Sequence, residues 1–160
     1  MGYQGSIPLV ALDDIGWWAR YIFDNAPSTA GKNLKIASEP SNFPHIVETF
    51  KRVTGLPAEY EALSMDDYFK LWNGNQIPLA SDDPKGISWE NNFRAWWAMW
   101  RDNIVQRDME WITSVHRPTT LEQWMRDTQY TGVLRSDPLL KNEADGRSKI
   151  QRLGWTQARL

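Results

Sequence analysis

The chain has 160 residues, of which 41% are hydrophobic and 24% charged, and its formal net charge is −2. This composition indicates a globular protein of one-domain size, and it excludes a disordered chain or one with a strongly basic surface for nucleic acid. Cysteine is absent and histidine occurs twice, which excludes disulfides and favours neither a metal site nor a His-dependent triad. No apolar run reaches transmembrane length, so we expect a cytoplasmic protein without a membrane partner.

The first predicted strand is an apolar run that leads directly into a predicted helix. Ile7–Leu12 reads as the strand, and apolar residues then recur at helical spacing from Ile15 to Phe23. Asp13 is the expected N-cap, and Asp14 is favoured beside the positive end of the helix dipole. The alternative for this acidic pair is general acid/base work, so Asp13 and Asp14 are the candidate catalytic residues.

Two further strands are expected before residue 64, at Asn33–Ser38 and at Ala58–Leu63. A helix capped by Ser41 or Asn42 lies between them and ends at Gly55. The alternation of strands and helices over residues 1–63 is typical of an α/β fold with a small parallel sheet.

Residues 64–160 are predicted to be mainly helical and to complete a single domain with the first 63 residues. Ser64 begins a short helix, and a Pro- and Gly-containing loop separates it from the long tryptophan-rich stretch Ser88–Val105. A further helix is expected over 108–116. A capping box, Thr119-Thr120-Leu121-Glu122, opens the next one.

The stretch that begins at Ser88 carries one wide aromatic stripe, because its tryptophans recur at helical spacing. Such a stripe usually packs into a core, and that is the first interpretation. The alternative is that some rings line a pocket for a small apolar or aromatic ligand. The candidate ligand-binding residues are Trp17, Trp96, Trp97 and Trp100.

Three stretches resemble one known family in the same order along the chain. They are Ile7–Gly16 (IPLVALDDIG), Ala30–Glu39 (AGKNLKIASE) and Phe43–Ala58. Together they resemble the C-terminal part of atypical short-chain dehydrogenase/reductases, and most closely the fungal NmrA-like proteins, which often carry tryptophan-rich C-terminal helices. The resemblance implies that the small sheet is the remnant of a Rossmann-like fold.

The chain departs from that family at the cofactor site. Neither G-x-x-G-x-x-G nor G-x-G-x-x-G occurs, and no Tyr-x-x-x-Lys pair is present. Family members hold NAD(P) at a Gly-rich turn, so the resemblance implies a C-terminal half without a dinucleotide site and without a cofactor of its own. No functional residue of the family can be carried over.

Three functions remain open at this point. The first is a module that binds a small ligand or a protein partner, in a family that includes redox-sensing regulators of transcription. The second is a cofactor-independent isomerase, cyclase or dehydratase of fungal secondary metabolism, using carboxylates such as Asp13, Asp14, Asp66 or Asp67. The third is a fragment of an NAD(P)-dependent oxidoreductase. A small sheet with a free edge and uncovered apolar surface favours a homodimer or a second protein chain as partner.

Overall fold

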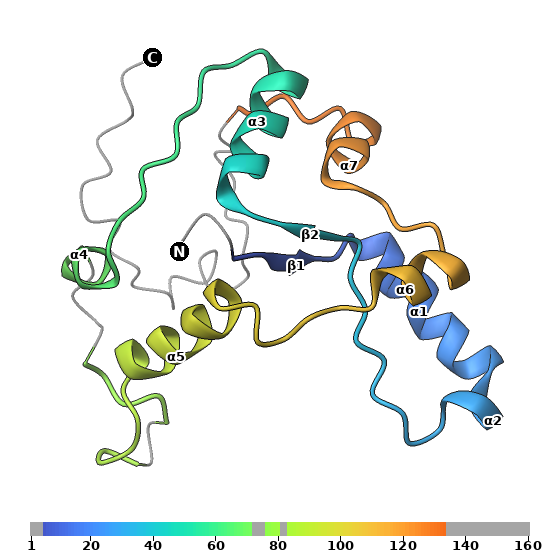
Figure 1. Cartoon of the computed structure of the whole chain (residues 1–160), viewed down its shortest axis with the longest axis horizontal. Coiled ribbons are helices and arrows are strands. Elements are labelled where there is room, and N and C mark those ends of the chain that lie inside the picture. The colour runs from blue at the N-terminus through green and yellow to red at the C-terminus, as the bar shows by residue number, and fades with distance from the viewer. Residues whose placement is uncertain (1–4, 72–75, 81–82, 134–160) are drawn as a thin grey trace, which may run out of the picture.

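The computed structural model describes residues 5–71, 76–80 and 83–133. Within these ranges the chain is α/β, with two strands and seven helices (Figure 1). The elements in chain order are β1 (Ile7–Leu9), α1 (Leu12–Asp24), α2 (Ala26–Thr29), β2 (Glu39–Ser41), α3 (Phe43–Thr54), α4 (Met65–Lys70), α5 (Trp89–Arg101), α6 (Met109–Val115) and α7 (Leu121–Asp127). The part of the predicted helical half that follows residue 133 lies outside the described residues.

The two strands pair in antiparallel fashion, so the expected parallel sheet is wrong. Pro8 lies opposite Pro40, between the pairs formed by the other residues of β1 and β2. In a parallel pair, the connection must bring the chain back to the level where the first strand began, usually through a helix that runs antiparallel to that strand. Here α1 leads away from the end of β1, and the chain comes back through residues 31–38 in the opposite direction (Figure 1).

The other strand expectations also differ from the structure. The second strand begins at Glu39, just after the predicted range Asn33–Ser38, and residues 58–63 form no strand. This last segment is attached by ring packing, since Tyr60 stacks on Phe43 with ring centroids 5.4 Å apart. Its alternating pattern rests on two alanines, which offer too little apolar surface to hold a strand in place.

Most of the predicted helix boundaries are confirmed. Asn42, Ser64 and Ser88 each cap a helix by accepting a hydrogen bond from the backbone N–H three residues later. Gly55 ends α3 with φ +72°, a left-handed conformation that favours glycine.

Two caps lie one or two residues away from the predicted positions. Ala11 stands at the N-cap of α1 without a side-chain hydrogen bond, so Asp13 is not the cap. Thr120 caps α7 in place of Thr119, and its hydroxyl accepts from the Gln123 N–H. In both cases the sequence offered two adjacent polar residues. Asp14 and Thr119 instead contact each other, since the Thr119 N–H donates a hydrogen bond to the Asp14 carboxylate.

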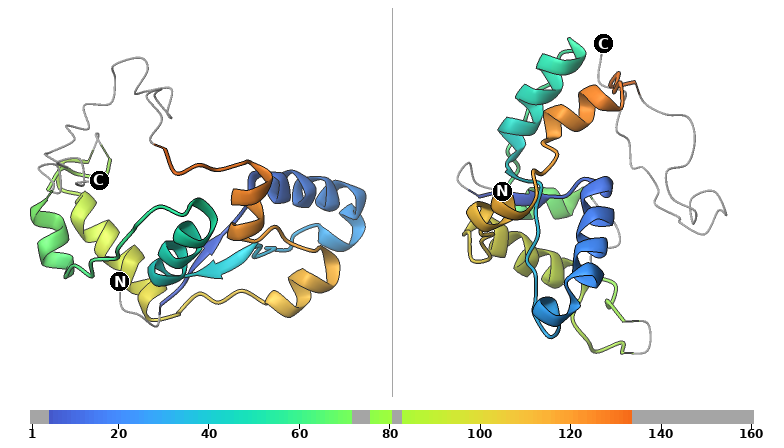
Figure 2. Two further views of the ribbon diagram at one scale, coloured as in Figure 1. Left: turned by 90° about the horizontal axis from the view of Figure 1, so that it is seen from above. Right: turned by 90° about the vertical axis from the view of Figure 1, so that its right-hand side faces the viewer.

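The core on one side of the sheet lies between α1, the segment before β2, and α6 (Figure 1). Trp18, Ala37 and Ile112 are buried there, and Trp17, Tyr21 and Trp111 pack around them. On the other side α3 and α7 lie side by side in both views of Figure 2. Arg52 of α3 reaches Glu122 of α7 across 2.7 Å.

The segment that precedes β1 passes directly over the end of α5. A Cβ added at Gly5 would lie 2.6 Å from the Cα of Arg101 and 2.9 Å from the carbonyl oxygen of Trp100. Because a side chain would not fit there, glycine is required for this close approach. Trp100, at this end of α5, is 7% exposed.

Candidate functional site

Asp14 is the one candidate catalytic residue around which the structure gathers other polar side chains. It lies in the first turn of α1 and is 3% exposed. Its carboxylate accepts hydrogen bonds from the Ser38 hydroxyl, from His116 Nε2 at 2.9 Å and from the Thr119 N–H at 2.9 Å. The Thr119 hydroxyl adds a bond of 3.2 Å. Three segments that are far apart in the sequence therefore meet at one carboxylate: the start of α1, the segment before β2 and the loop after α6.

The electrostatics of this site favour the ionised form of Asp14. Burial raises the pKa of the carboxyl, but the hydrogen bonds from Ser38, His116 and Thr119 together outweigh it and leave the pKa below its ordinary value. A carboxylate with a lowered pKa is a poor general base, because it binds a proton only weakly.

The order of the three side chains also differs from a nucleophilic triad. In such a triad the histidine contacts the hydroxyl and the carboxylate orients the histidine. Here the carboxylate stands between Ser38 and His116, and the Ser38 hydroxyl itself donates to Asp14 while accepting from the Ala11 N–H at 2.9 Å. The serine is 4% exposed. The arrangement is suited to joining segments and gives Ser38 no adjacent base.

Trp17, a candidate ligand-binding residue, lies beside this site. Its indole stacks on the His116 imidazole, with centroids 4.1 Å apart and planes 14° apart. It also stacks on Tyr21 at 5.4 Å. The Trp17 ring is thus already in contact with two side chains of the protein, and its stacking on His116 helps to hold the imidazole against Asp14.

The remaining carboxylate candidates are spread over the surface. Asp13 is exposed and directed away from its neighbour Asp14. Asp67 bonds the Ser64 hydroxyl at 2.6 Å and Lys70 at 2.8 Å, as part of the α4 cap. Asp66 pairs with Arg94 at 2.7 Å. The acidic residues considered for catalysis are therefore not brought together.

The aromatic stripe of α5 is divided between core and surface. Trp100 is buried, and its Nε1 has no hydrogen-bond partner among the described residues. Trp97 lies against Phe43 at 6.0 Å, whereas Trp96 is 42% exposed. None of these three rings lines the pockets beside Trp111, beside Pro8 and beside Tyr130. The interpretation of the stripe as core packing is confirmed for Trp100.

Sequence reasoning missed the partners of Asp14. His116 was noted only as one of two histidines, and Ser38 was assigned to a strand. The sequence indicates only that Asp14 lies in the first turn of a helix that follows a strand, a position that is often buried. It does not indicate that Ser38 and His116, which are 24 and 102 positions away, contact the Asp14 carboxylate.

Helix α1 has a second apolar face that packs on nothing in the described structure. We call this the outer face, and it consists of exposed residues at helical spacing: Leu12, Ile15, Gly16, Ala19, Ile22 and Phe23. Leu12 and Phe23 are 81% and 80% exposed. The opposite side of the helix carries the buried Trp18 and Asp14. A helix that is apolar on both sides is normally covered on both sides.

The two prolines at the centre of the sheet bear on the expectation that its edge invites pairing. Pro8 and Pro40 lie opposite each other and neither has an N–H, so they must form a non-hydrogen-bonded pair of the ladder. In such a pair each backbone N–H would point to the outer edge. The central donor is therefore missing from both edges, which disfavours strand addition.

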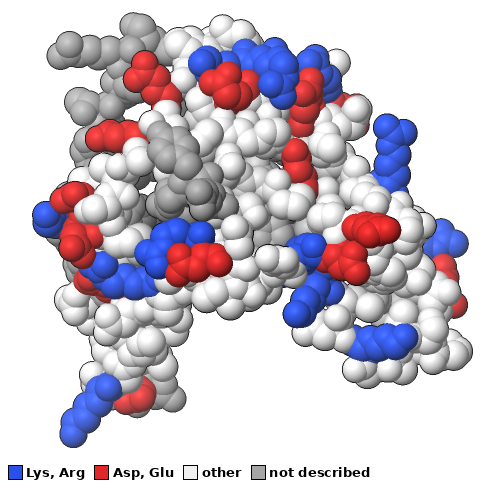
Figure 3. All heavy atoms as spheres, in the orientation of Figure 1, with Lys and Arg blue, Asp and Glu red and all other residues white. Residues whose placement is uncertain are grey.

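Charged side chains do not gather into a single patch on the face shown in Figure 3. Positive and negative side chains are interspersed on the face shown in Figure 3, especially over α3. Among the described residues no group of three or more His, Asp or Glu side chains could hold a metal ion. In the same part of the chain no helix is long and apolar enough to cross a membrane.

Comparison of the chain with models of protein families, with curated proteins and with solved structures gave no match.

Proposed function

We propose that this chain is a protein-binding module that docks through the outer face of α1. The observation that carries the proposal is that α1 is apolar on two opposite sides while the described residues cover only one of them. Covering the four large side chains of the outer face would contribute on the order of 5 kcal/mol in each copy, and the two copies together would offset a cost of association of about 4–15 kcal/mol.

A second copy of the same chain fits this face best. Its large residues lie at the two ends of the helix, Leu12 at one and Phe23 at the other, and Gly16 and Ala19 lie between them. If two such helices cross in antiparallel order, Leu12 of each meets Phe23 of the other. The small central residues then let the backbones approach closely, as a two-fold interface requires.

The family relation is likewise a proposal, namely that the chain is the C-terminal region of an NmrA-like protein without an NAD(P) site of its own. It is supported by the ordered sequence patterns and not by the sheet, whose strands are antiparallel. The enzyme alternative finds little support, since Asp14 is fully engaged by its partners and the other carboxylates are dispersed.

The docking proposal is tested by light scattering coupled to size exclusion over a range of micromolar concentrations. We expect the wild-type chain to have twice its 18.6 kDa mass and Phe23→Glu to have 18.6 kDa. The matched control is Leu71→Glu, which changes an exposed apolar residue after α4 and should remain dimeric. A wild-type monomer at every concentration would contradict the dimer. In that case the outer face would bind a different protein chain. This is what the interpretation as a fragment of an oxidoreductase implies, because the rest of that protein would cover the face.

A further inference from the structure

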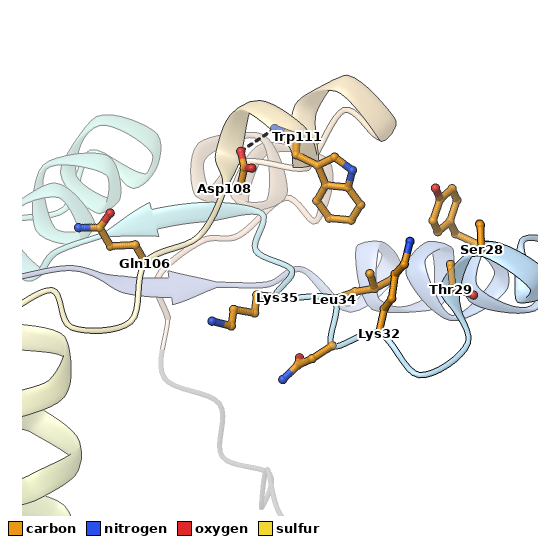
Figure 4. Close-up of a pocket in the computed structure, with 10 residues that line it drawn as sticks. Ser28, Thr29, Lys32, Leu34, Lys35, Gln106, Asp108 and Trp111 are labelled. Carbon is orange, nitrogen blue, oxygen red and sulfur yellow. Dashed lines mark hydrogen bonds between the residues drawn. The ribbon is translucent and has the colours of Figure 1, made fainter.

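A groove of about 470 Å³ lies on the side of α1 opposite to its outer face (Figure 4). Its walls come from the end of α1, from α2, from the extended residues 32–35 and from the start of α6. The residues that matter for binding are Tyr21, Ser28, Lys32, Lys35 and Trp111. Its size is in the range of sites for small organic molecules.

The two aromatic rings of the groove are held in place by the protein core. Tyr21 packs edge-on against the buried Trp18 with centroids 5.4 Å apart, and Trp111 packs against the same indole at 5.3 Å. Trp111 also has its backbone N–H fixed by Asp108 Oδ1 at 2.9 Å. Because these rings are fixed before a ligand arrives, they form a preorganised apolar wall.

The groove also contains positive charge that no described acidic side chain neutralises by an ion pair. Within the part of the chain that the structure describes, neither Lys32 nor Lys35 forms an ion pair. Asp108 is the one acidic residue of the lining, and it caps α6. In Figure 4 the Lys32 ammonium points toward the side of the groove where Trp111 and Ser28 lie, and Lys35 extends toward Gln106.

We propose that this groove binds a small planar aromatic carboxylate. The flat ring of the ligand packs against Trp111 and Tyr21, as aromatic pairs do in offset or edge-to-face geometry. The carboxylate accepts a charge-assisted hydrogen bond from Lys32, whose ammonium lies on the side of the aromatic rings. An aromatic cation would be repelled by this ammonium group, and a neutral aromatic compound would leave it unused.

The test uses 2-naphthoate as the probe, titrated into the full chain and followed by ¹H–¹⁵N NMR. We expect saturable shifts at the Trp111 indole N–H and at the amides of residues 32–35. We expect Lys32→Met, which keeps the aliphatic stem and removes the charge, to weaken binding at least tenfold. Lys85→Met, at an exposed lysine outside the groove, is the matched control and should bind like the wild-type chain. The neutral analogue 2-naphthalenemethanol should bind at least tenfold more weakly.

Three results would overturn the proposal. One is the absence of saturable shifts up to millimolar probe, and another is equal affinity of Lys32→Met and the wild-type chain. The third is a set of shifts confined to the outer face of α1, which would indicate non-specific apolar binding. Since Lys32 is exposed, its substitution should not unfold the protein, and an unchanged melting temperature checks this point.

Discussion

His116 Nε2 lies 2.9 Å from Asp14 Oδ1, although the two residues are 102 positions apart in the sequence. This contact fixes the loop after α6 to the first turn of α1, and Thr119 adds two more bonds from the same loop. The carboxylate therefore acts as a junction between the first and last parts of the described chain.

The first prediction concerns the replacement of Asp14 by Asn. The amide carries no negative charge and has only one acceptor oxygen, so the hydrogen bonds to this side chain lose their charge assistance, and those that face the NH₂ group must reverse direction or break. We expect Asp14→Asn to lower the free energy of unfolding by about 2–4 kcal/mol, because bonds to a buried charged group are among the stronger ones. Urea denaturation followed by circular dichroism measures this loss.

The matched control for that variant is Asp13→Asn, because Asp13 is the adjacent residue and is exposed. We expect it to change the free energy of unfolding by less than about 0.5 kcal/mol, as surface substitutions usually do. If the two variants were equally stable, the buried carboxylate would not be the junction described here.

The second prediction concerns the dependence of stability on pH. Burial raises the pKa of Asp14, but the bonds from Ser38, His116 and Thr119 lower it by more, so the folded pKa is below the unfolded one of about 3.9. A depressed folded pKa means that the ionised group contributes stability above about pH 5, and that this contribution is lost as the pH falls through 4 and below.

The measurement compares the wild-type chain with Asp14→Asn over this acid range. We expect the difference in their free energies of unfolding to be largest near neutral pH and to shrink as the pH falls. A difference that stays constant down to pH 3 would mean that the proton of Asp14 is not linked to folding.

The local features of this fold could be predicted from the sequence because they depend on neighbouring residues. The caps Asn42, Ser64 and Ser88 and the left-handed Gly55 were found in this way. Each cap needs only a hydroxyl or amide and a free N–H three residues later, so the information lies within one turn.

The sheet and the site could not be predicted, because both depend on direction and distance in space. The same strand and helix patterns fit a parallel or an antiparallel pair, and the path of α1 away from β1 decides between them. Likewise nothing near Asp14 in the sequence identifies Ser38 and His116 as its partners. Of the ligand-binding candidates, Trp17 proved to be a neighbour of that site, and the groove beside Lys32 was not anticipated at all.

The last prediction separates two tryptophans that lie four residues apart on α5. Trp100 is 7% exposed, whereas Trp96 is 42% exposed. Truncating a buried indole leaves a large cavity, so we expect Trp100→Ala to lower the free energy of unfolding by about 3–5 kcal/mol. For Trp96→Ala we expect a loss of about 1 kcal/mol, since much of its ring is already in contact with water. Urea denaturation of both variants gives the comparison.

A small loss for Trp100→Ala would show that α5 does not depend on this ring for its packing. A loss for Trp96→Ala as large as that for Trp100→Ala would show that Trp96 is covered in solution by another chain.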